Sequence, residues 1–98
     1  MGTGDRVMYE SIQVWVYVDE SVAKRYNCFR RLSDGTYCIQ SVDFIRLPID
    51  KEQIYQLDAQ FYELFIEVAP DERSRTYSTI EEAIRAHDRE FEQSSRES

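Results

Sequence analysis

The residues that could perform chemistry in this chain are few and widely spaced. His87 is the only histidine, and histidine is the residue type whose unperturbed pKa lies near neutral pH. A histidine that acts in nucleophilic catalysis needs a Ser or Cys beside it, and none lies at an informative spacing from His87. His87 falls within an apolar helical stripe. We therefore interpret it as a packed side chain and not as a catalytic group.

The two cysteines, Cys28 and Cys38, lie ten residues apart. This is not a metal-ligand spacing, and with a single histidine the chain offers too few ligands for zinc. Both cysteines alternate with apolar neighbours, where a buried thiol acts as a small hydrophobic group. Only Arg30 and Arg31 are placed to activate a thiolate. We expect two free thiols, no metal and no cofactor.

Adjacent carboxylates occur as Asp71-Glu72 and Glu81-Glu82. Paired carboxylates can serve as general acid and base in a cleft, but nothing in the sequence indicates a cleft around them. Glu81-Glu82 begins an expected helix, where the helix dipole favours negative charge. The chain also has no P-loop, no G-x-G-x-x-G and no G-x-S-x-G motif. We expect a protein that binds, not an enzyme.

The first expected strand, 10–18, alternates strictly between two kinds of residue. One face is aliphatic and is expected to point into the core; it carries Ile12, Val14, Val16 and Val18. The other face carries two large aromatics, Trp15 and Tyr17, and we expect Phe29 and Arg31 beside them. Aromatic residues and arginine are enriched at protein interfaces. We identify Trp15, Tyr17, Phe29 and Arg31 as interface candidates, with an internal core as the alternative.

Two further strands, 25–32 and 36–45, flank the turn signal Asp34-Gly35. A two-residue loop would pair Leu32 with Tyr37, and a three-residue loop would pair Leu32 with Thr36. Neither register places the two cysteines directly opposite each other, which agrees with free thiols.

A helix is expected over 51–68, with Asp50 as its N-cap and Pro70 beyond its end. Its apolar residues follow a helical stripe and its Glu and Gln residues gather on the opposite side. The rival interpretation is a fourth strand at 61–68, because that segment is rich in β-forming residues. A second helix is expected over 79–92, begun by a capping box at Ser78 or Thr79.

These elements predict one α+β domain over 1–98, with loose tails at 1–8 and 94–98: a three-stranded antiparallel sheet packed with two helices. No internal repeat or linker is visible. No apolar stretch is long enough for a membrane span, and no signal peptide is recognised, so we expect a soluble, cytoplasmic protein.

The net charge of the chain limits the classes of partner that it is expected to bind. Nineteen acidic residues against twelve Lys and Arg give a net charge of −7, and only the segment 22–46 is basic, with a net +3. Nucleic-acid binding depends on many cationic contacts, so we expect none here. The first hypothesis is a non-enzymatic protein-interaction module that forms a homo-oligomer or binds another protein. The alternatives are a small acidic inhibitor of the antitoxin or immunity type, and a small-ligand-binding domain.

Overall fold

The computed structural model describes residues 7–97, with side chains up to Phe91. Three strands form one antiparallel sheet in the order β1-β2-β3: β1 (Tyr9–Tyr17), β2 (Val22–Arg31) and β3 (Thr36–Arg46). Three helices follow: α1 (Lys51–Glu67), α2 (Pro70–Arg73) and α3 (Ile80–Glu97). The α+β class is therefore confirmed, and the rival strand at 61–68 is wrong because that segment belongs to α1, up to Glu67.

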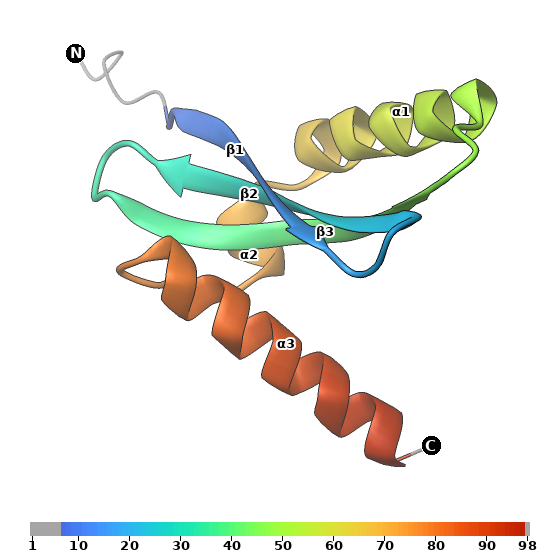
Figure 1. The fold of residues 1–98 in the computed structure, drawn as a ribbon. Coiled ribbons are helices and arrows are strands. Elements are labelled where there is room, and N and C mark those ends of the chain that lie inside the picture. Colours follow the sequence, from blue (N-terminus) through green and yellow to red (C-terminus); the bar gives the residue numbers. More distant parts are fainter. Residues whose placement is uncertain (1–6, 98) are drawn as a thin grey trace.

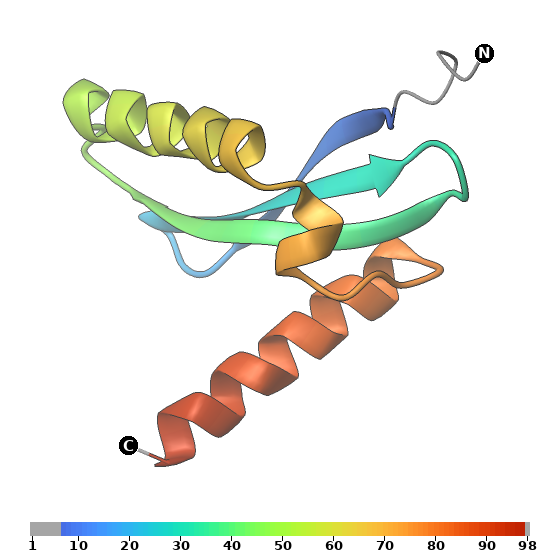
Figure 2. The ribbon, with the colours of Figure 1, turned by 180° about the vertical axis from the view of Figure 1, so that it is seen from behind.

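The helices cover both faces of the sheet. Figures 1 and 2, which view the molecule from opposite sides, show α1 on one face and α3 on the other. The C-terminal half of α3 runs away from the sheet in both views. No helix among the described residues is long and apolar enough to cross a membrane.

The hairpin between β2 and β3 differs from both expected registers. Arg31 pairs with Thr36, so the turn has four residues, 32–35, and Gly35 takes the positive φ of 70° that the turn requires. A register shift follows between Asn27 and Cys28. The expected registers were wrong because the Asp-Gly signal locates a turn but does not fix its length. A β-bulge, in addition, cannot be recognised from the alternation of residues in a single strand.

This register places the two thiols on opposite faces of the sheet. Cys28 pairs with Ile39, and Cys38 pairs with Phe29. Successive residues of a strand point to opposite faces, so Cys28 faces α3 and Cys38 faces α1. Both thiols are buried and free, as expected.

The α3 face is a closed core. Its centre is formed by the buried residues Tyr26, Cys28, Ile39 and Ala83. Partly buried aliphatic and aromatic residues pack around it, among them Ile12 and Val14 of β1. The other two aliphatic residues of the first strand pattern, Val16 and Val18, are exposed instead, because the closed core ends before them.

The helix termini follow their local sequence. Asp50 caps α1 by accepting hydrogen bonds from the N–H groups of Glu52 and Gln53, and the Glu and Gln residues of the predicted polar side are exposed. Thr79 caps α3 by accepting from the N–H of Glu82 at 3.1 Å. The α3 helix continues to Glu97, beyond the expected end at 92 and through most of the tail expected at 94–98. Most of the other expected tail, residues 1–6, lies outside the described part of the chain.

Candidate interaction surface at the first strand

The strand β1 forms one edge of the sheet. The Leu32 N–H donates to the Met8 carbonyl, and the Val18 N–H donates to the Val22 carbonyl, both at 2.9 Å. Backbone groups alternate in direction along an antiparallel strand, so the even-numbered residues of β1 bond to β2 and the odd-numbered ones point outward. Within residues 7–97 no other strand pairs with this outer edge.

The edge of β1 lacks the features that normally prevent edge-to-edge pairing. Its nine residues include no proline and no lysine or arginine, and Glu10 is its single charged residue. The pairing of β1 with β2 is regular over its whole length, without a bulge. Natural proteins usually protect an exposed edge with charges, proline or a bulge. This edge is long and open to a further strand.

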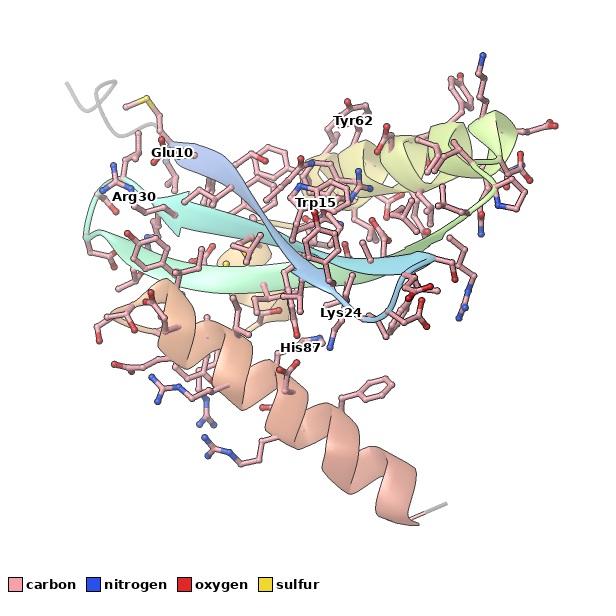
Figure 3. The ribbon with its side chains drawn as sticks, in the orientation of Figure 1. Glu10, Trp15, Lys24, Arg30, Tyr62 and His87 are labelled. Atoms are coloured by element: carbon pink, nitrogen blue, oxygen red, sulfur yellow. The ribbon has the colours of Figure 1, made fainter. Side chains whose placement is uncertain are left out.

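The aromatic residues of β1 are exposed on the α1 face of this edge. Trp15 is 54% exposed and Tyr17 is 92% exposed. The Trp15 ring lies against the guanidinium of Arg25, with the Arg25 Cζ 5.8 Å from the ring centroid. Figure 3 shows Trp15 on the side of the sheet that α1 occupies. Large aromatic side chains in contact with water are uncommon on a monomer's surface when they adjoin other apolar groups.

A cluster of aromatic rings fills the other end of the same face. Phe29 stacks on Phe65 and Phe61, with ring centroids 4.9 and 5.5 Å apart, and Tyr9 meets Phe65 edge to face at 5.7 Å. A cavity of about 290 Å³ opens beside this cluster; it is lined by Phe29, Phe61, Tyr62, Phe65 and Ile66.

The side of α1 that borders this cavity was not identified from the sequence. Tyr62 and Ile66 are exposed there, and Tyr55 continues the same apolar row toward the helix start. The signal was present as the spacing 55, 62 and 66, which places three apolar residues on one side of a helix. It was hidden because this row lies beside the main apolar stripe that packs on the sheet.

The four predicted interface residues share the α1 face but not one position on it. Trp15 pairs with Arg25, whereas Phe29 pairs with Ser11, four residues further along β1. Phe29 is only 5% exposed, because α1 covers it. Phe29 therefore serves the internal packing of α1.

Arg31, the fourth predicted residue, connects the sheet to α2. Its guanidinium forms an ion pair with Asp71 at 2.7 Å. The Tyr9 hydroxyl also donates to Asp71, and burial together with this carboxylate raises the pKa of Tyr9 to about 12. Arg31 therefore holds α2 in place.

A buried polar network lies between Trp15 and α1. The Arg25 guanidinium contacts Asp43 at 2.6 Å and Asp58 at 3.1 Å, and the side-chain amide of Asn27 donates to Ser41 and Asp43. Burial alone would lower the pKa of Arg25, but the hydrogen bonds and charges of Asp43 and Asp58 outweigh it and raise the pKa. The network attaches α1 to the centre of the sheet, and the end of β1 that carries Trp15 and Tyr17 stays exposed beside it.

The two cysteines and His87, the remaining candidates for chemistry, are packed among other side chains of the fold. Burial raises the pKa of the Cys28 thiol to about 12 and that of Cys38 to about 11, so neither forms the reactive thiolate at neutral pH. The His87 ring packs edge to face on Tyr26, with centroids 6.2 Å apart. The carboxylate nearest to its Nδ1 is that of Asp88, at 3.9 Å, which accepts a hydrogen bond from the Tyr26 hydroxyl.

No group of three or more His, Cys, Asp or Glu side chains that could hold a metal ion occurs in the described part of the chain. The comparisons with known proteins gave no match: no family model, no curated protein and no solved structure matches this chain.

Proposed function

We propose that this protein is a non-enzymatic interaction module that self-associates through the outer edge of β1. One observation carries the proposal: β1 combines an unprotected, regular sheet edge with two exposed aromatic side chains on one of its faces. An open edge supplies a row of backbone donors and acceptors for a second strand. The aromatic residues supply the apolar area that makes such pairing stable in water.

The occupant that fits this edge is a second copy of the chain. Closed two-fold dimers are the commonest assemblies of small soluble proteins. A two-fold axis perpendicular to the sheet pairs two β1 strands antiparallel and keeps both α1 helices on the same side. With the axis at Gln13, all nine residues overlap. Trp15 of one copy then lies opposite Ser11 of the other, and Tyr17 lies opposite Tyr9.

This pairing places the aromatic residues of one copy near the aromatic cluster of the other. Ser11 pairs with Phe29 inside each monomer, so it lies between the outer edge and the apolar cavity beside Phe29, Phe61 and Phe65. Trp15 of the second copy extends over Ser11 toward this cavity, and Tyr17 extends toward Tyr9 and its neighbour Phe65. Each copy thus contributes an aromatic pair and receives one.

Sedimentation velocity tests the proposal. We expect the wild-type protein to form a concentration-dependent dimer, and the double variant Trp15→Ser, Tyr17→Ser to be a monomer with an unchanged circular dichroism spectrum. The matched control is Phe44→Ser, Phe91→Ser, which removes two exposed aromatics from the opposite face and should leave the dimer intact. A wild-type protein that stays monomeric at high concentration would contradict the proposal.

A further inference from the structure

Four arginines gather on the side of the molecule opposite the aromatic face. Arg75, Arg85 and Arg89 line a groove of about 500 Å³ together with Tyr77 and neighbouring residues of α3. A smaller hollow of about 140 Å³ adjoins it and adds Arg73 and His87. The two hollows share Arg75, Tyr77 and Glu90, so they form one continuous depression between α3 and the segment that precedes it.

The wall of the groove that precedes α3 is fixed to the sheet. The backbone of Tyr77 exchanges two hydrogen bonds with Tyr37, each 2.7 Å long. The Ser74 hydroxyl donates to the Ile39 carbonyl, also at 2.7 Å. Arg75 lies between these two anchors, and its backbone position is therefore set by β3. Such anchoring reduces the entropy cost of holding a ligand.

The opposite wall is the α3 helix, whose orientation is set by its packing. Ala83 is buried on the sheet, and Ile80 and Ile84 pack beside it. Arg85 and Arg89 are four residues apart and therefore project from the same side of the helix. Ala86 lies between them on the lining, and its methyl group leaves room for a ligand. Figure 3 shows His87 on the part of α3 that faces the sheet.

The groove is electropositive in a chain that carries a net charge of −7. Its lining contains four arginines against two carboxylates, Glu82 and Glu90. Glu82 is engaged locally, because its carboxylate accepts a hydrogen bond from Ser78 at 3.2 Å. Within the described side chains, Arg73, Arg75 and Arg85 form no ion pair with a carboxylate. The Arg85 Nε donates to the Glu81 carbonyl at 3.4 Å, which leaves the terminal N–H groups of Arg85 and the guanidinium groups of Arg73 and Arg75 for an anion.

We propose that this groove binds a small phosphate-bearing polyanion, held by Arg75, Arg85 and Arg89. Guanidinium groups present paired N–H donors that match phosphate oxygens, and several of them together bind a multiply charged group. The volume falls within the range of small-molecule sites, about 300–1,000 Å³. A long nucleic acid does not fit the same reasoning, because the rest of the acidic surface repels an extended polyanion.

The test uses inorganic pyrophosphate as the probe and the full chain. In ¹H–¹⁵N spectra we expect saturable shifts of the amides between residues 73 and 90, and calorimetry gives the affinity. The variant Arg75→Gln, Arg85→Gln should bind at least about tenfold more weakly, because it removes two of the three guanidinium groups proposed to bond to phosphate oxygens. The control Arg30→Gln, Arg46→Gln removes the same charge elsewhere and should keep wild-type affinity.

Three results would overturn the proposal: no saturable shift with pyrophosphate, equal weakening in the control variant, or tighter binding of a single-stranded RNA oligonucleotide than of pyrophosphate. A charge-conserving variant, Arg85→Lys, separates geometry from charge and should show an intermediate loss. The groove lies on the α3 side and uses no residue of β1. Pyrophosphate binding should therefore persist in Trp15→Ser, Tyr17→Ser, so this proposal and the proposed dimer can fail independently.

Discussion

The two edge strands of the sheet, β1 and β3, differ in whether their outward backbone groups are hydrogen-bonded. At β3, the outward backbone groups of Tyr37 bond to Tyr77, and the Ile39 carbonyl accepts from Ser74. At β1, the outward groups of the odd-numbered residues meet no other strand of the described chain. The chain that connects α2 and α3 covers the first part of the β3 edge, whereas the β1 edge is open along its whole length.

The difference shows where a second strand can be added. Ser74 and Tyr77 bond to outward groups of Ile39 and Tyr37, so the first part of the β3 edge is already occupied from within the molecule. The open edge also carries the exposed Trp15 and Tyr17 on the face that α1 leaves uncovered. In the proposed dimer the two open β1 edges would satisfy each other in a closed two-fold pair.

The largest expected effect comes from proline at an inward-bonded position of β1. The backbone N–H of Val14 points to β2, where Val14 pairs with Tyr26. Val14→Pro removes this ladder bond and the side chain that packs in the α3-face core. We expect a loss of about 3 kcal/mol or more in the free energy of unfolding, measured by denaturant titration. A variant with wild-type stability would show that β1 is not paired as described.

Proline one residue earlier separates association from folding. The N–H of Gln13 points outward, so Gln13→Pro keeps every bond between β1 and β2 and blocks only the pairing of a second strand. We expect a monomer in sedimentation velocity, with stability within about 1 kcal/mol of the wild-type monomer's. If Gln13→Pro still dimerises, association uses a surface other than the β1 edge.

Sequence alone predicted the elements better than their contacts. The helical stripe of α1 and the capping residue Asp50 are local patterns, and the structure bears them out. The register of β2 with β3 and the existence of α2 are not local. The ion pair of Arg31 with Asp71 spans 40 residues, and neither partner has a neighbouring residue that indicates the other.

The candidate surface was predictable in composition but not in detail. Trp15 and Phe29 look alike in the sequence, since each is an aromatic residue within an alternating strand. The position of α1 separates them: the helix covers Phe29 and leaves Trp15 exposed. That position depends on Arg25, Asp43 and Asp58, which meet only after the chain has folded. Contacts between residues this far apart in the sequence cannot be predicted from the alternation of residues within one strand.

A smaller effect on stability is expected when one of the hydrogen bonds to the β3 edge is removed. Ser74→Ala removes the hydroxyl that donates to the Ile39 carbonyl but retains the backbone bridge between Tyr37 and Tyr77. We expect a loss of about 1 kcal/mol in the free energy of unfolding and an unchanged dimer. Larger assemblies in sedimentation velocity would show that this hydrogen bond is what keeps β3 from pairing.

The smallest change in stability is expected for Gln13→Cys, which compares the open β1 edge with the buried interior of the sheet through thiol reactivity. The native thiols Cys28 and Cys38 should react slowly with a thiol reagent at pH 8, because burial raises their pKa values to about 12 and about 11. A thiol at position 13 is exposed and should react fast in dilute protein.

At concentrations that favour the dimer, mild oxidation of Gln13→Cys should link two copies. Residues opposite each other in a hydrogen-bonded pair have Cα atoms about 5.5 Å apart, which is within disulfide reach. The control Ser33→Cys, in the exposed turn between β2 and β3, should react as fast but should not cross-link more efficiently than random collision allows. Equal cross-linking of both variants would place the two-fold axis away from Gln13.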